Sequence, residues 1–193
     1  MPDDAIARDL IAAWIGECSR RDSHFSRANV TTHGHSVSHP HRVFDLPRAR
    51  LAERGALRAS RSEVIRYLVH VGGRPFGAAE LAVDRAGRAI RVLSTNHGQF
   101  VHSSHRAFLG LDSMDFLQSK TESRHIRILR ISALGLLAVW LHDPGGREPI
   151  LIPLEPCTNE YEPGRPYSED EYFAIAAAIA IDRLAKEGSS SLP

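Results

Sequence analysis

Apolar residues recur along the chain with two periods, which predict helices at both ends and strands between them. In the range 3–21, six apolar residues recur at steps of three and four, so this range is predicted to form an amphipathic helix. A last helix is predicted to begin at Ser168, because Ser168 and Glu171 have the spacing of a capping box. The chain is therefore expected to begin and end in helices.

Strict alternation marks the segment after residue 63 as a strand. In VIRYLVHV (64–71), Ile65, Tyr67, Val69 and Val71 fall on one face and a more polar set falls on the other. Short glycine-containing turns follow, the first of them at the pair Gly72-Gly73, as expected for an antiparallel meander. A helix is predicted between 97 and 120, interrupted at Gly110. The other predicted strands are 76–83, 89–95, 125–131, 134–141 and 149–154.

These elements predict an α+β domain with the order α-(long loop)-βββ-α-βββ-α, an antiparallel sheet and helices packed on one face. Residues 1–193 are expected to form one domain, with a long irregular His/Arg-rich segment at about 23–60. Within that segment, 43–46 is a candidate short strand and 48–57 a candidate short helix. The element order is similar to that of bacterial secretion chaperones. That resemblance is one of element order, and no motif matches residue by residue.

Charge is divided unevenly between the two halves of the chain. Residues 1–110 hold 16 arginines and 10 acidic residues (+6), and residues 111–193 hold 8 basic and 13 acidic residues (−5), which gives the net charge of +1. The pI near 8.0 argues against nucleic-acid binding, as does the scarcity of aromatic residues in the arginine-rich segment 42–66, where Phe44 alone is interleaved with the arginines. An acidic N-terminus and the lack of a long apolar run predict a cytoplasmic protein without a membrane span.

Four histidines in nine residues form the most distinctive chemical pattern. His33, His35, His39 and His41 make two H-x-H pairs inside the irregular segment. Alternate residues of an extended chain point to the same side, and neutral imidazole is a common ligand of zinc and copper. These four residues are therefore the candidate metal ligands. A solvated polar loop is the alternative interpretation.

Other candidate groups carry weaker signals. His97, His102 and His105 form a second histidine group, for which a polar helix face is the alternative. Cys157 follows a predicted strand, but its acidic neighbours would raise the pKa of its thiol rather than activate it. The sequence contains no phosphate-binding loop and no nucleophile elbow.

These observations favour a non-enzymatic, partner-binding domain of bacterial type, either an adaptor or a chaperone-like protein. An open antiparallel sheet and the polarity between the basic segment 42–66 and the acidic segment 143–171 suit a protein or peptide partner, or self-association. The alternative is a transition-metal-binding protein or metal-dependent enzyme that uses the His-rich loop. No catalytic residue and no cofactor is assigned.

Overall fold

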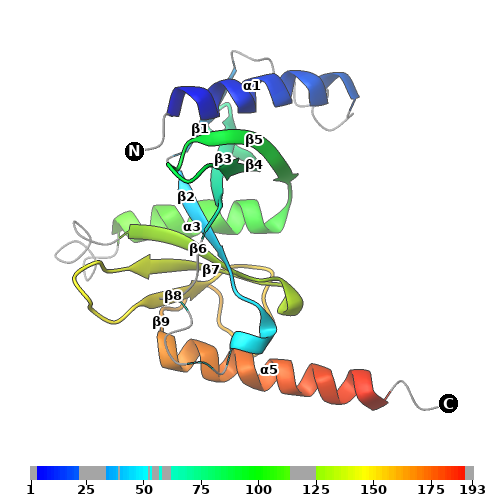
Figure 1. The fold of residues 1–193 in the computed structure, drawn as a ribbon, viewed down its shortest axis with the longest axis vertical. Helices are drawn as coiled ribbons and strands as arrows, with labels where there is room; N and C mark the ends of the chain where they lie inside the picture. The colour runs from blue at the N-terminus through cyan, green and yellow to red at the C-terminus, as the bar shows by residue number, and fades with distance from the viewer. Residues whose placement is uncertain are drawn as a thin grey trace. The chain divides into compact units, whose positions relative to one another are not determined.

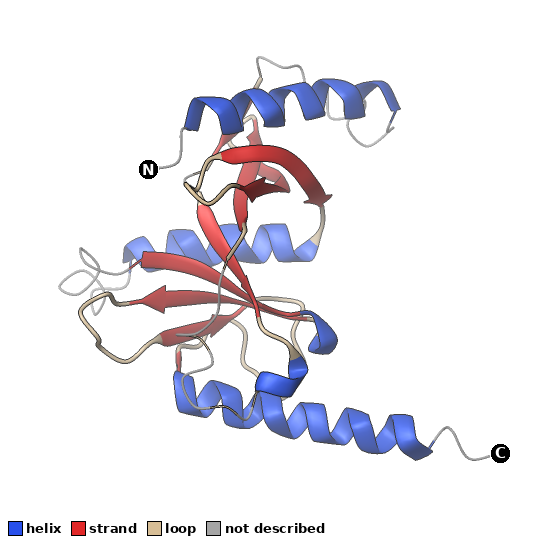
Figure 2. Ribbon diagram, viewed as in Figure 1, coloured by secondary structure: helices blue, strands red, loops and turns tan. Residues whose placement is uncertain are grey.

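The computed structural model describes residues 4–21, 34–38, 40–51, 53, 57, 62–113 and 125–189, and the chain divides into two compact units. Unit 1 consists of residues 1–43 and 62–105, and unit 2 consists of residues 44–61 and 106–193. The described part contains three α-helices and a nine-stranded, mostly antiparallel sheet (Figures 1 and 2). The expected mixture of helices and antiparallel strands is therefore confirmed.

Unit 1 is built around strand β3, which has antiparallel neighbours on both sides. β3 pairs with β1, β2 and β4, and β4 pairs with β5. Strand β2 and helix α3 are divided between the units, since the unit boundaries fall within them. The elements are α1 (Asp4–Arg21), β1 (His35–Val37), β2 (His41–Asp45), β3 (Val64–Val71), β4 (Arg74–Val83), β5 (Ala89–Asn96) and α3 (Gln99–Ser113).

Helix α1 covers the apolar face of this part of the sheet. Ile11 and Ile15 of α1 are fully buried, and they belong to one core with Ile65 and Tyr67 of β3. The prediction that the odd-numbered residues of β3 share one apolar face is thus confirmed, because these residues pack in the core with α1. Burial of such side chains contributes about 1.5–3 kcal/mol each, which explains why this helix needs the sheet beneath it.

The turn between β3 and β4 has the backbone that a tight hairpin requires. Gly72 and Gly73 both have positive φ, at 57° and 76°. Two consecutive positive φ values are typical of a type I′ turn, whose twist matches that of the paired strands. The hairpin predicted from the Gly-Gly pair is therefore confirmed.

Unit 2 has a second core, covered by the C-terminal helix. Leu129, Trp140 and Tyr172 are among its buried residues, and α5 supplies Ala176. The backbone N–H of Glu171 donates to Oγ of Ser168 at 3.2 Å, so Ser168 caps the helix as predicted. The remaining elements are η1 (Arg48–Arg50), β6 (His125–Ile131), η2 (Ser132–Leu134), β7 (Leu136–His142), β8 (Ile150–Pro153), β9 (Tyr167–Ser168) and α5 (Glu169–Ser189).

The structure differs from the sequence prediction in two respects. Strand β1 lies inside the segment 23–60 where no element was predicted, and α3 runs through Gly110 without the predicted interruption. The predicted order α-(long loop)-βββ-α-βββ-α and the packing of all helices on one face are not confirmed. β1 spans only three residues, too few to show a period in the sequence, whereas β2 overlaps the candidate short strand at 43–46.

Candidate functional site

The face of the unit 1 sheet opposite to α1 carries a row of polar side chains across four neighbouring strands. Pairing places His41 of β2 opposite Arg66, Arg66 opposite Glu80 of β4, and Glu80 opposite Ser94 of β5. Directly opposite residues project to the same face of a sheet. The even-numbered positions of β3, which looked merely more polar in the sequence, therefore begin a continuous polar row.

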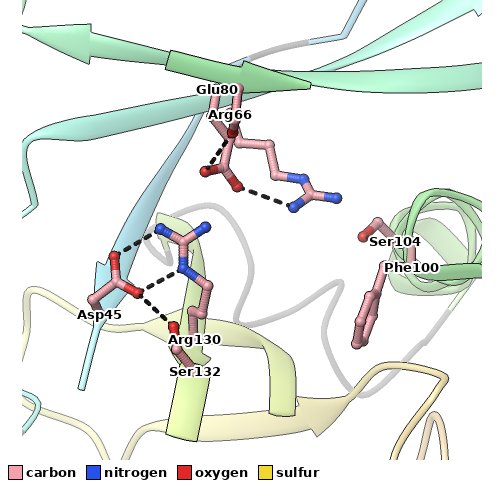
Figure 3. A network of polar contacts seen from close by, with 8 residues as sticks. Asp45, Arg66, Glu80, Phe100, Ser104, Arg130 and Ser132 are labelled. Atoms are coloured by element: carbon pink, nitrogen blue, oxygen red, sulfur yellow. Dashed lines mark hydrogen bonds and ion pairs between the residues drawn. The ribbon is translucent and has the colours of Figure 1, made fainter. Parts of the chain in front are cut away.

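An ion pair with almost no solvent exposure forms the centre of this row (Figure 3). Nη1 of Arg66 lies 3.2 Å from Oε1 of Glu80, and the two residues are 4% and 3% exposed. Oγ of Ser94 donates to the second carboxylate oxygen of Glu80 at 3.5 Å. Two charges removed from water need each other, so the pair constrains how β3 and β4 are arranged.

Helix α3 adds buried hydroxyl groups to the same unit. Ser104 is fully buried, and its Oγ donates to the carbonyl oxygen of Phe100 at 2.7 Å. Figure 3 shows the guanidinium of Arg66 directed toward the turn of α3 that carries Ser104. A buried serine that bonds to the carbonyl four residues earlier is satisfied within its own helix. The Ser104 hydroxyl therefore has a structural role within α3.

Two histidines from different elements meet at the end of the sheet. Nε2 of His70, near the end of β3, lies 3.3 Å from Nδ1 of His105 on α3, and the two rings are T-shaped with centroids 5.2 Å apart. Burial lowers the pKa of His70, and the neighbouring His105 lowers it further. The uncharged form of His70 is therefore favoured, and a neutral imidazole has one nitrogen able to accept a proton or bind a metal.

The four candidate metal ligands are only partly described. His35 pairs opposite Val71 and His41 opposite Arg66, positions that are five residues apart along β3 and on opposite faces. His33 and His39 lie outside the described residues. Within the described part of the chain, no group of three or more His, Cys, Asp or Glu side chains could hold a metal ion. The four-histidine site stays a prediction, and the structure does not bring His35 and His41 together.

The second histidine group is divided among different surroundings. Nδ1 of His97 lies 3.4 Å from the carbonyl oxygen of Phe76, His102 is exposed on α3, and His105 contacts His70. Sequence reasoning missed His70 because its partner lies 35 residues away along the chain. The one available signal was its position on the polar face of β3.

Unit 2 holds its arginines against aromatic rings and carboxylates. The guanidinium carbon of Arg127 lies 4.9 Å from the ring centre of Phe44 and 4.8 Å from that of Trp140, a cation–π arrangement. Arg130 donates to both carboxylate oxygens of Asp45 at 2.6 and 2.8 Å (Figure 3). These contacts fix β6 against the end of β2 within the unit, so the two arginines have structural roles.

Cys157 has the surroundings of a packing residue. Its Sγ lies 3.7 Å from the carbonyl oxygen of Tyr161, and the residue packs against the unit 2 core. Burial raises the pKa of the thiol, and the negative charge of Glu155 raises it further. The thiolate is therefore disfavoured, in agreement with the interpretation of Cys157 as a structural residue.

Two buried tyrosines make unit 2 sensitive to alkaline pH. Burial is the main cause that raises the pKa of Tyr161 and of Tyr172 far above the ordinary value of about 10. The raised pKa favours the neutral phenol in the folded state. The contribution of the two buried phenols to the free energy of unfolding is therefore present below pH about 10 and is lost as pH rises above that value. We expect urea unfolding of the protein to show this loss.

Replacing Tyr172 by phenylalanine tests whether ionisation of the buried tyrosines causes the alkaline loss of stability. Its hydroxyl is buried and has no hydrogen-bond partner in the described structure, so Tyr172→Phe is expected to leave stability at neutral pH unchanged or to raise it by up to about 1 kcal/mol. The loss above pH 10 should be smaller in this variant. Tyr161→Phe is the contrasting control, because the Tyr161 hydroxyl donates to the carbonyl oxygen of Tyr172 at 2.7 Å. Equal alkaline loss in Tyr172→Phe and the parent protein would contradict the assignment.

Comparison of the chain with family models, curated proteins and solved structures gave no match. Among the described residues, no helix is both long and apolar enough to cross a membrane.

Proposed function

We propose that this protein is a non-enzymatic binding module, an adaptor or chaperone-like protein of the cytoplasm, which takes an acidic protein or peptide segment along strand β5. The observation that supports this most is the display of two large apolar side chains on that strand. Ile90 is 56% exposed and Leu93 is 40% exposed, although both belong to a strand of the sheet. In this proposal, helix α1 lies behind the strand and holds it in place.

The pairing of β5 explains how those side chains come to be exposed. Among the described strands β5 pairs with β4 alone, and the register shifts twice along the pair. Ile90 and Leu93 are the two residues of β5 that the shifts leave without an opposite residue. A bulge of this kind re-aims a side chain and blunts indiscriminate pairing of a sheet edge. We infer that the edge selects its partner through these side chains.

Charge favours an acidic partner over a second copy. Strand β5 contains Arg91 and no carboxylate, and Arg85 and Arg88 lie in the turn before it. Of these, Arg88 is paired with Asp84 at 2.8 Å. Antiparallel pairing of β5 with its own copy would bring like charges close together, which is unfavourable. An extended acidic segment with apolar anchors would match both the exposed apolar side chains of β5 and the positive charge of the arginines in and before it.

Selection from a displayed library of random ten-residue peptides tests the proposal. We expect the pool enriched on the full-length protein to be rich in acidic and apolar residues. Fluorescence polarisation should show its binding to fall by about tenfold or more when Ile90→Ser and Leu93→Ser are combined, because the loss of two apolar anchors costs more than 1.4 kcal/mol.

Leu184→Ser is the matched control, because Leu184 on α5 is 49% exposed and lies in the other unit. Its binding should equal that of the parent. A pool that binds the double variant as well as the parent, or the lack of any enriched pool, would rule out the β5 site. A dimer in sedimentation velocity that dissociates in the double variant would identify a second copy as the partner.

A further inference from the structure

The contact between His70 and His105 has the dimensions of a metal site. Two imidazole nitrogens bound at about 2.0–2.1 Å from a tetrahedral zinc ion lie about 3.3–3.4 Å apart. Nε2 of His70 and Nδ1 of His105 are separated by 3.3 Å. N–H···O hydrogen bonds in proteins have their most common length at about 2.9–3.0 Å, so 3.3 Å is long by that standard. The present spacing therefore suits two ligands of one ion as well as it suits a shared proton.

The elements that carry the two rings hold them at this distance without a metal. His70 lies in β3, paired on one side with Ser36 of β1 and on the other with Pro75 of β4. His105 lies on the buried side of α3, next to the fully buried Ser104. Both rings are partly buried, so each has restricted freedom. Ligands that are already positioned lose little conformational entropy when an ion binds.

The chemistry of the pair also suits a cation of the class that binds imidazole. A neutral imidazole has one nitrogen without a proton, and that nitrogen is the donor atom in metal ligation. Within the described residues, no carboxylate or thiol joins the two rings to make a group of three. Such a pair would hold an ion by two nitrogens and leave two tetrahedral positions to water or to an external donor, one more than the single open position of catalytic zinc sites.

We propose that His70 and His105 bind a divalent transition-metal ion, with zinc as the test case, through Nε2 of His70 and Nδ1 of His105. Binding moves the remaining proton of each neutral ring to its outward nitrogen, Nδ1 of His70 and Nε2 of His105. The charge of both rings is unchanged by this step. The site is separate from the proposed β5 surface and does not depend on it.

Calorimetric titration of the tag-free, metal-free protein with zinc alone is the first test. Loss of a partner that merely supports a ligand costs about 10–100-fold in metal affinity, so His105→Gln and His70→Ala should each weaken one zinc site by at least about tenfold. His102→Gln is the matched control, because His102 is exposed on the same helix. It should leave that affinity unchanged. Equal zinc affinity in His105→Gln and the parent would overturn the proposal.

Imidazole nitrogen NMR of the parent protein tests the same site without a substitution that could disturb the fold. At zinc saturation, the signals of His70 and His105 should shift to the values of metal-bound nitrogens, with protons retained on the outward nitrogens. Saturation by zinc that leaves both rings unchanged would place the ion elsewhere, for example at the four histidines between 33 and 41, and would overturn the proposal. Failure to bind zinc at all would overturn it too.

Discussion

Replacing Glu80 by alanine is expected to lower the free energy of unfolding of unit 1 by about 3–5 kcal/mol, because the substitution leaves the positive charge of Arg66 buried without its carboxylate. Both residues are less than 5% exposed, so water cannot replace the lost partner without opening the sheet. Exposed pairs contribute only about 0–1 kcal/mol, and burial is what makes the expected effect large. Urea unfolding followed by tryptophan fluorescence measures it, with Glu80→Ala and its reference both carrying Trp140→Phe so that Trp14 is the one tryptophan left.

The matched control removes both charges together. Arg66→Met combined with Glu80→Leu replaces the pair by apolar side chains of similar volume, and such replacements are often neutral or stabilising by about 1–4 kcal/mol. We expect the double variant to be at least as stable as the parent. A loss below about 1 kcal/mol in Glu80→Ala would show that the pair is screened like a surface pair. An additive loss in the double variant would show that the two charges act independently.

The elements with strong local patterns were predictable from sequence. The alternation in β3, the glycine pair that follows it and the Ser168 cap of α5 each rest on neighbouring residues, and each is confirmed. Gly110 misled the prediction for α3. A glycine inside a helix costs only about 1 kcal/mol relative to alanine, and the burial of Val101 and Leu111 on the same helix outweighs this cost.

The candidate sites were less predictable, because they depend on contacts between distant residues. Arg66 and Glu80 stand on strands of clear pattern, yet only the register of the hairpin places them opposite each other. His105 was singled out with two histidines of its own segment, but it meets His70 from another element. Clustering in the sequence measures separation along the chain, whereas a site requires proximity in space. The bulges that expose Ile90 and Leu93 likewise have no signature in the sequence.

Trp140→Ala is expected to lower the free energy of unfolding of unit 2 by about 3–5 kcal/mol, the usual cost of truncating a buried aromatic residue. Trp140 is 1% exposed, packs edge-on against Phe44 with centroids 5.0 Å apart, and lies beneath the guanidinium of Arg127. Truncation therefore opens a cavity and also removes half of the cation–π contact. Urea unfolding followed by far-ultraviolet circular dichroism measures the loss.

Trp140→Phe is the matched control. Nε1 of Trp140 has no hydrogen-bond partner in the described structure, so phenylalanine loses no bond and keeps an aromatic ring. We expect a clearly smaller loss than in Trp140→Ala, and equal losses would contradict the packing explanation.

The same alanine variant tests whether the chain unfolds as one domain. The protein has two tryptophans, with Trp14 in unit 1 and Trp140 in unit 2, so in Trp140→Ala all tryptophan fluorescence comes from unit 1. If residues 1–193 form the single domain predicted from sequence, the fluorescence of Trp14 and the circular dichroism should move together to lower urea. If the fluorescence midpoint stays at its value in the parent protein while the circular dichroism shows an earlier transition, the two units unfold separately and the single-domain prediction is wrong.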